Sequence, residues 1–254
     1  MNQIVNIISL LFLITLLENH KAIQQHDITP DQIIKDRPHQ IYIYEKYEMT
    51  IISIADMFEF IYIPSNAESV DSAAKKGNYK IMINGSFFDG TRLAAEHAGW
   101  LRLFGKIYSP IKDDRQLTHV FRFNLDEKKV NLIPYQEFRP LDDNRSIEFQ
   151  TGPLVVDSNK VAQKYIAESI NGLGKYTRTL LAITDRRHFH FIIIRKRLAL
   201  DELGNYLTSL SIFSNKRLDV VNLDGGPSVA LYVEKYPELN YNADARLPIL
   251  LGVN

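Results

Sequence analysis

Residues 220–228, Val-Val-Asn-Leu-Asp-Gly-Gly-Pro-Ser, constrain the fold more than any other stretch of this chain. The first half is short, apolar and β-branched, which is typical of a buried strand. The second half cannot continue as a strand, because two glycines and a proline favour a sharp turn, and glycine allows the backbone to approach another group closely. Asp224 lies at the junction, so we expect its carboxylate at the end of a rigid strand. Taken alone, the stretch is also compatible with an ordinary Asp-Gly turn.

Composition narrows the class of protein. The chain has 254 residues, of which 45% are hydrophobic, enough for one large domain or two small ones. Basic and acidic residues are equal at 30 each, so the chain lacks the basic excess of a nucleic-acid-binding protein. It contains no cysteine, which excludes disulfides, thiolate metal sites and a cysteine nucleophile.

The N-terminus predicts export. The run Ile4–Leu17 is almost entirely apolar and has the length of a signal-peptide hydrophobic region, too short for a comfortable transmembrane helix. We therefore expect a signal peptide or N-terminal anchor at residues 1–22, and a protein outside the cytoplasm that meets a membrane only through this segment. Residues 23–40 are predicted to be a spacer with one short helix near residues 30–35. A single domain is expected over residues 41–254.

Two segments have the strand-helix-strand pattern of a βαβ unit, and each ends in a glycine turn with an acidic residue. Parallel strands with a right-handed crossover are expected in the first unit. Crevices at the carboxyl ends of such strands commonly bind ligands. The predicted elements are residues 57–63, 67–76 and 79–84 in the first unit, and residues 188–194, 201–214 and 218–223 in the second.

The intervening chain has the pattern of β-hairpins, around residues 99–108, 120–133 and 178–194. The sequence therefore predicts an α+β fold: one domain with a mixed β-sheet built from βαβ units and hairpins, and with helices packed outside.

Four segments, taken in order, resemble the motifs of the phosphodiester glycosidase family. Residues 84–89, Asn-Gly-Ser-Phe-Phe-Asp, resemble its NGGFFD motif, and residues 223–228, Leu-Asp-Gly-Gly-Pro-Ser, resemble its LDGGgSs signature. Residues 151–155 and the pair Arg178-Thr179 are similar to its sGPlLv and RTaiGi segments. Residues 105–108 are similar to a hairpin of the family. The sequence departs from the motifs at Ser86, Pro227 and Val229.

The resemblance implies hydrolysis of a sugar-1-phosphodiester to a free sugar and a phosphomonoester, with such a diester or a phosphorylated glycan as partner and no cofactor. A phosphomonoester is a better leaving group than the alkoxide of an ordinary glycoside, so strong general-acid help is less necessary. Asp224 is the candidate carboxylate near the anomeric carbon, and Arg178 is the candidate phosphate ligand because its planar fork matches phosphate oxygens. The candidate substrate-binding residues are Asn84, Gly85, Phe88, Asp89, Gly152, Gly225, Gly226 and Ser228. Either Phe87 or Phe88 is expected to pack on a sugar face, with the other in the core.

Two other functions remain open at this point. One is a non-catalytic module that binds glycans or envelope polymers. The other is a metal-dependent phosphodiesterase that recruits His188 and His190, which lie two apart on one predicted strand. No third ligand is evident from the sequence, so no metal site is expected.

Overall fold

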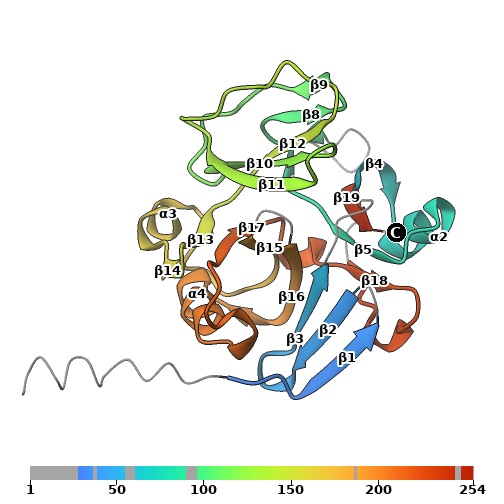
Figure 1. Cartoon of the computed structure of the whole chain (residues 1–254), viewed down its shortest axis with the longest axis vertical. Coiled ribbons are helices and arrows are strands. Elements are labelled where there is room, and N and C mark those ends of the chain that lie inside the picture. The colour runs from blue at the N-terminus through green and yellow to red at the C-terminus, as the bar shows by residue number, and fades with distance from the viewer. Residues whose placement is uncertain are drawn as a thin grey trace, which may run out of the picture.

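The computed structural model describes residues 28–36, 39–54, 61–89, 96–185, 188–243 and 247–253. Over these residues the chain forms four β-sheets and three α-helices (Figure 1). The signal peptide or anchor expected at residues 1–22 lies outside the described residues.

The largest sheet has eight strands, and all neighbouring strands in it are antiparallel. Their order is β1 (Gln32–Asp36), β2 (His39–Tyr44), β3 (Met49–Ile54), β16 (His188–Leu198), β15 (Tyr176–Asp185), β17 (Asp219–Asn222), β13 (Leu154–Asp157) and β14 (Lys160–Val161). The short helix predicted near residues 30–35 is wrong, because β1 occupies most of that stretch and satisfies its backbone by pairing with β2. The hairpin predicted over residues 178–194 is confirmed by the pairing of β15 with β16.

Helices α3 (Gln163–Glu168) and α4 (Leu200–Thr208) cover one face of this sheet (Figure 1). Leu200, Leu203 and Leu207 recur at helical spacing and are fully buried against the sheet. Burying one such side chain contributes about 2 kcal/mol. The helix predicted over residues 201–214 stops at Thr208, and a 3₁₀ turn, η2 (Ser211–Phe213), carries the apolar pattern onward.

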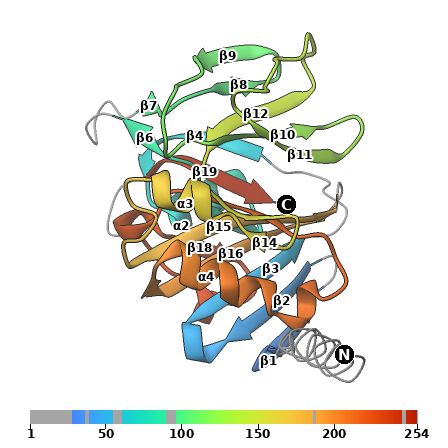
Figure 2. The same cartoon turned by 90° about the vertical axis from the view of Figure 1, so that its left-hand side faces the viewer.

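The second sheet has five antiparallel strands and lies at one end of the molecule, whereas β1 lies at the other end (Figure 2). Its order is β11 (Lys129–Pro134), β10 (His119–Asn124), β12 (Ser146–Thr151), β8 (Leu101–Leu103) and β9 (Lys106–Ser109). The hairpins predicted over residues 99–108 and 120–133 are confirmed as the pairs β8–β9 and β10–β11.

The third sheet has four strands and packs beside helix α2 (Val70–Gly77). Its order is β18 (Leu231–Val233), β5 (Ile81–Asn84), β19 (Leu247–Val253) and β4 (Ile61–Glu68). Helix α2 begins after Ser69, whose hydroxyl accepts a hydrogen bond from the Ser72 amide, and it ends at Asn78 in the left-handed conformation. The smallest sheet pairs β6 (Phe88–Asp89) with β7 (Glu96–His97). The remaining 3₁₀ turns are η1 (Glu45–Tyr47), η3 (Gly226–Ser228) and η4 (Pro237–Leu239).

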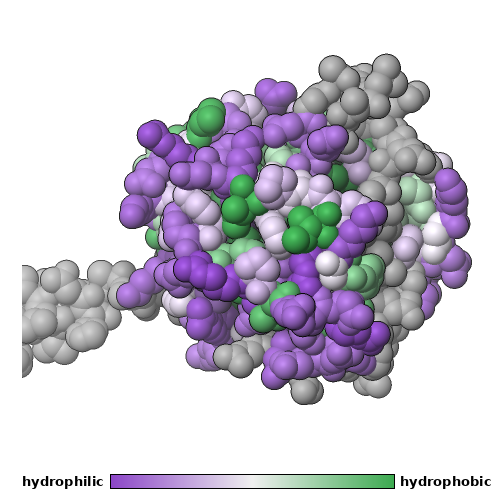
Figure 3. All heavy atoms as spheres, turned by 90° about the horizontal axis from the view of Figure 1, so that it is seen from above, coloured by the Kyte–Doolittle hydropathy of each residue, from purple (hydrophilic) through white to green (hydrophobic). Residues whose placement is uncertain are grey.

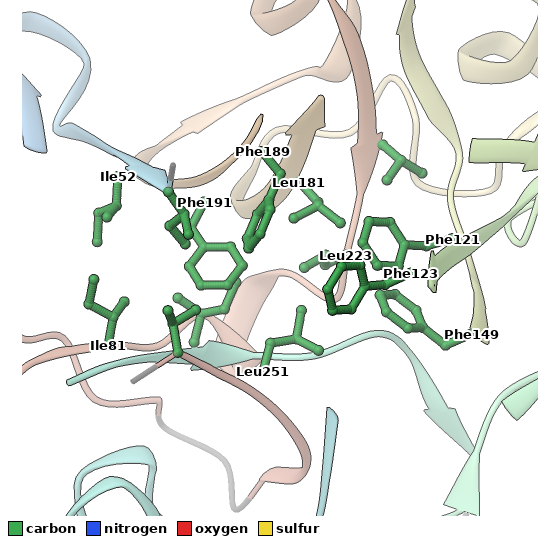
Figure 4. Close-up of a cluster of buried hydrophobic side chains, with 14 of the residues drawn as sticks. Ile52, Ile81, Phe121, Phe123, Phe149, Leu181, Phe189, Phe191, Leu223 and Leu251 are labelled. Atoms are coloured by element: carbon green, nitrogen blue, oxygen red, sulfur yellow. The ribbon is translucent and has the colours of Figure 1, made fainter. Parts of the chain in front are cut away.

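The main core lies where the three large sheets meet (Figure 4). The eight-stranded sheet contributes side chains such as Phe189 and Leu181, the five-stranded sheet contributes Phe121 and Phe149, and the four-stranded sheet contributes Leu251. Because this one core joins all three sheets, a segment at the end of one sheet is held firmly against the others.

The predicted fold class is wrong. The chain is mostly β, the described part has three α-helices, and its sheets are not assembled from βαβ units. In each strand-helix-strand segment the two strands run in the same direction, but a third strand lies between them, antiparallel to both: β19 between β4 and β5, and β15 between β16 and β17. Local patterning shows the elements but not which strand inserts between them: β19 comes from the far end of the described chain, and β15 directly precedes β16.

The surface at the five-stranded-sheet end is mostly hydrophilic with separate hydrophobic patches (Figure 3). Phe104 and Ile107 of the β8–β9 hairpin are among the exposed apolar side chains of the molecule. Of the helices in the described ranges, none is both long and apolar enough to span a membrane.

Candidate active site

A cleft of about 250 Å³ opens where β5 and β17 end and β15 begins. Four separate segments form its wall: the turn after β5, the chain before β10, the approach to and start of β15, and the turn after β17. Its lining residues are Phe87, Gln116, Asn171, Tyr176, Arg178, Asp224, Gly225, Gly226 and Pro227. The structure therefore brings Asp224 and Arg178 together, with Gly225 and Gly226 beside them.

The backbone of Asp224 is fixed by the turn after β5. Its N–H donates to the Gly85 carbonyl over 3.2 Å, and its carbonyl accepts a hydrogen bond of 2.8 Å from the Asn84 side chain. The carboxylate accepts a hydrogen bond from the Gly225 N–H at 2.9 Å and another from the Ser228 side chain. Burial nevertheless raises the pKa of the Asp224 carboxyl to about 6, since the two hydrogen bonds only partly offset the loss of solvent.

The two glycines of the turn are required for different structural reasons. A Cβ on Gly225 would lie 2.8 Å from the Thr177 carbonyl oxygen, so a side chain there would push the turn away from β15. Gly226 has open space around it but a φ of +60°, so glycine is favoured there because of the backbone conformation. Its carbonyl accepts a hydrogen bond of 2.9 Å from the Thr177 hydroxyl. Of the two departures from the family signature here, Pro227 lines the cleft, whereas Val229 is fully buried in the main core.

Arg178 is a buried cation with no carboxylate partner among the described residues. Its side chain is 3% exposed, and its Nη2 donates to the carbonyls of Asn171 and Gly174, both at 2.8 Å. Its Nε finds no acceptor in the described structure. Burial lowers the pKa of the guanidinium to about 10, so it stays protonated at neutral pH. A buried positive charge that the chain does not neutralise favours an anionic ligand.

The structure places Asn84 beneath the cleft. Its Oδ1 accepts hydrogen bonds from the Thr179 hydroxyl at 2.6 Å and the Ala230 amide at 3.1 Å, and its Nδ2 donates to Asp224. The side chain is 1% exposed, and these intrachain bonds use it to hold the turn after β17. Gly85 is also structural, because a Cβ there would lie 2.4 Å from the Ile249 side chain.

Of the two neighbouring phenylalanines, Phe87 lines the cleft and Phe88 packs against the main core. Phe88, the candidate substrate-binding residue of this pair, therefore lies outside the cleft lining, and Phe87 takes its place there. Asp89 is exposed and pairs with Lys112 at 2.9 Å, outside the cleft lining.

Gly152 lies outside the cleft lining and contacts the segments that form it. It exchanges hydrogen bonds with Asn222 at the end of β17, over 3.1 and 3.2 Å. A Cβ on Gly152 would lie 2.4 Å from the backbone oxygen of Gln116, so glycine lets the segment that carries Gln116 pack closely.

Three lining residues were missed by the sequence reasoning: Gln116, Asn171 and Tyr176. Gln116 lies in a segment held by the fully buried Gln150, whose amide bonds to both backbone groups of Lys112 and to the Leu117 carbonyl. No local motif marks such a loop. Asn171 and Tyr176 could have been found, because they lie beside Gly172 and Gly174 at the approach to β15.

The two histidines considered as metal ligands have other partners. His190 is buried, with Nδ1 2.6 Å from the Ser53 hydroxyl and Nε2 3.1 Å from the Thr184 hydroxyl. His188 pairs with Asp185 at 2.6 Å on the surface. Within the described ranges, no three His, Asp or Glu side chains gather as metal ligands do.

Comparison with known proteins defines the class. The phosphodiester glycosidase family profile matches residues 77–253, and the chain belongs to this family. The family assignment made from the four motifs is therefore confirmed. Among curated proteins, none matches the sequence.

The chain is also similar to several solved structures. One is the catalytic domain of zebrafish N-acetylglucosamine-1-phosphodiester alpha-N-acetylglucosaminidase, auto-inhibited by its pro-peptide, with 15% identity over 88% of this chain and 81% of that one, and a TM-score of 0.59. Another is a Burkholderia pseudomallei protein named as exported, with 9% identity over 85% and 74% of the chains and a TM-score of 0.60. A hypothetical protein from Synechocystis has 12% identity over 87% and 61%, with a TM-score of 0.53. At these identities the likeness concerns the fold.

Proposed function

We propose that the cleft hydrolyses the glycosidic bond of a sugar-1-phosphodiester, giving a free sugar and a phosphomonoester. The observation that carries the proposal is the pairing of unlike groups in one cleft: the unneutralised guanidinium of Arg178 and the carboxylate of Asp224. Asp224 is the one acidic residue among the residues that line the cleft. Membership of the phosphodiester glycosidase family supports the same reaction class.

Arg178 binds the phosphate in this proposal. Its guanidinium is oriented by the Asn171 and Gly174 carbonyls and by the Tyr176 ring, whose centroid is 5.1 Å away. A fixed planar fork stabilises the charge that gathers on the phosphate oxygens as the bond to the sugar breaks. Because the departing phosphate carries that charge well, the cleft does not need a second carboxylic acid to protonate it.

Asp224 acts at the anomeric carbon, as nucleophile, as general base toward water, or by stabilising the oxocarbenium-like transition state. A pKa of about 6 leaves the carboxyl mostly ionised at neutral pH yet more basic than an exposed aspartate. The bond between C1 and the bridging oxygen breaks, the water oxygen remains on C1, one water proton stays on the new hydroxyl, and the other passes to the base or the solvent. Phe87 and Tyr176 provide aromatic surface for the substrate on the cleft wall.

Hydrolysis in ¹⁸O-labelled water tests the reaction. Sugar-1-phosphodiesters are the substrates, and we expect the label on the sugar. Label on the phosphate would instead indicate a phosphodiesterase, and binding without turnover would indicate a glycan-binding module. Either result overturns the proposal.

The residue roles need matched variants. Asp224→Asn keeps the shape of the side chain and should lower turnover at least about a hundredfold. Asp89→Asn makes the same chemical change at an exposed position outside the cleft lining and should leave turnover unchanged. Equal rates for wild type and Asp224→Asn would remove Asp224 from the mechanism.

We also propose that the protein acts outside the cytoplasm. The apolar run at residues 4–17 and the likeness to a protein named as exported support this location. Cell fractionation with an antiserum tests it, and this avoids a tag on β19, whose side chains are buried through Val253. Recovery of the full-length protein only from the cytoplasm would contradict the proposal.

A further inference from the structure

Three apolar side chains project into solvent beside the cleft. Ile170, Leu173 and Tyr176 are 80%, 60% and 42% exposed, and we call them the apolar rim. All three lie in residues 169–176, which comprise the loop after α3 and the first residue of β15, Tyr176; we call this segment the 169–176 loop. Exposing large aliphatic side chains so close together is unfavourable unless a ligand or partner covers them.

The loop that carries the rim is anchored from its inner side. The Gly172 amide donates to the Ser169 carbonyl over 3.3 Å, and the Gly172 carbonyl accepts from the Leu200 amide at the start of α4 over 3.0 Å. A Cβ on Gly172 would lie 1.9 Å from the Ile166 carbonyl oxygen, so the loop packs directly on α3. The exposure of Ile170 and Leu173 is therefore a property of a fixed loop.

The same loop forms part of the cleft. Its Asn171 and Gly174 carbonyls hold the guanidinium of Arg178, and its residues Asn171 and Tyr176 line the cleft. Tyr176 belongs to both the cleft lining and the rim, and its ring lies over the guanidinium. The apolar rim is thus continuous with the proposed phosphate site.

This continuity bears on the second ester of the substrate, and the inference rests on the function proposed above. A phosphodiester at Arg178 has two substituents, and the sugar must reach Asp224. A second substituent that extends toward the 169–176 loop, whose carbonyls hold the Arg178 guanidinium, would meet the apolar rim. The one charged side chain of that loop, Lys175, pairs with Glu202 at 3.0 Å, so the loop offers no unpaired charge to a second phosphate.

We propose that the rim binds the hydrocarbon chain of a lipid alcohol esterified to the phosphate, so that the substrate class is a sugar-1-phospholipid. Water adds across the bond between C1 and the bridging oxygen, and the products are the free sugar and the lipid phosphate. The phosphorus–oxygen bond to the lipid remains intact. Ile170 and Leu173 contact the chain and take no part in bond breaking.

Binding of two phosphomonoesters tests the rim without any turnover. Octyl phosphate and methyl phosphate share the headgroup, and calorimetry compares their affinities for the wild-type protein. Burial of even two methylenes corresponds to about a tenfold change in affinity, so octyl phosphate should bind at least about tenfold more tightly. The double variant Ile170→Ser/Leu173→Ser should lose this preference and bind methyl phosphate as the wild type does.

Ile107→Ser is the matched control. It removes an equally apolar, exposed side chain from β9 in the five-stranded sheet, outside the cleft lining, and should keep the preference for octyl phosphate. Equal binding of the two phosphates by wild type, or an undiminished preference in the rim variant, overturns the inference.

Turnover then separates this inference from the function on which it rests. The octyl and methyl diesters of α-N-acetylglucosamine 1-phosphate are the probes, and the wild type should have the larger kcat/KM for the octyl diester. If neither is hydrolysed while the chain-length preference in binding persists and depends on the rim, the lipid site stands and the hydrolase function fails. If both are hydrolysed equally, the function stands and the lipid site fails.

Discussion

Replacing Asp224 by asparagine should make the protein more stable at neutral pH, although we expect the same change to lower turnover. The folded protein holds the pKa of this carboxyl at about 6, against an ordinary value of 3.8 in the unfolded chain. Between these two pH values the folded state binds a proton that the unfolded state has released. Stability therefore falls as the pH rises from about 4 to about 6, and the loss remains at higher pH.

The magnitude follows from the two pKa values. Moving the pKa from 3.8 to about 6 corresponds to about 3 kcal/mol at neutral pH. The carboxylate faces the cleft and is partly accessible to solvent, so about 1–3 kcal/mol is a realistic range after screening. Asparagine has the same shape and no charge to bury. In a protein of this size the gain corresponds to a rise in Tm of about 2–12 °C.

Calorimetric melting of wild type and Asp224→Asn at pH 4 and pH 7.5 measures this effect. The difference in Tm should be present at pH 7.5 and largely absent at pH 4, where the carboxyl of the folded wild type is protonated. Asp89→Asn, an exposed control, should shift Tm little at either pH. An Asp224→Asn variant that melts below wild type at pH 7.5, or that differs equally at both pH values, would refute the reasoning. The same ionisation should give wild-type kcat/KM an acidic limb near pH 6.

Four further substitutions test the phosphate ligand, the glycine turn and the buried hydrogen bonds around the cleft. Arg178→Lys keeps a charge but cannot reproduce the planar fork, so kcat/KM should fall at least about tenfold in steady-state assays. Gly225→Ala should lower the free energy of unfolding by about 2–3 kcal/mol, because its Cβ meets the Thr177 carbonyl oxygen at 2.8 Å. Gly226→Ala, in open space at φ +60°, should cost only about 1 kcal/mol, and equal costs in urea unfolding would contradict this distinction. Gln150→Leu should cost about 3–5 kcal/mol, since it leaves several buried backbone groups unpaired.

The positions that sequence reasoning placed correctly in the cleft are those whose environment is local. Asp224 follows a β-branched run and precedes two glycines, so its place at a strand end is evident from the adjacent residues. Arg178 directly precedes an apolar β-strand pattern and is the third residue of β15. Both belong to motifs of the matched family.

The positions that were misjudged depend on distant partners. The dipeptide Asn84-Gly85 does not indicate what the Asn84 side-chain amide contacts. It could face a ligand, but here it donates to a backbone carbonyl 140 residues away. The choice between Phe87 and Phe88 depends on the register of a two-residue strand with β7. Gln116 is positioned by Gln150, and no spacing rule connects a loop to a buried amide in another strand.

The fold class was missed for the same physical reason. Strand and helix periodicities correctly indicated most elements, including three hairpins, because those patterns are local. The order of strands in a sheet is set by long-range pairing. β19 comes between β4 and β5 only through contacts with residues more than 160 positions earlier in the chain, which the local pattern does not contain.

The position of β19 also fixes when the cleft can form as the chain leaves the ribosome. Gly85, whose carbonyl accepts the hydrogen bond from the Asp224 amide, donates its own amide hydrogen to the Ile249 carbonyl, so the turn after β5 lacks this support until β19 has emerged and inserted. Until then, β4 and β5 lack the strand that pairs with both of them. Their backbone edges toward β19 stay unpaired while more than 160 residues are synthesised. The cleft should therefore form in one late step of folding, and chaperone demand should be greatest just before it.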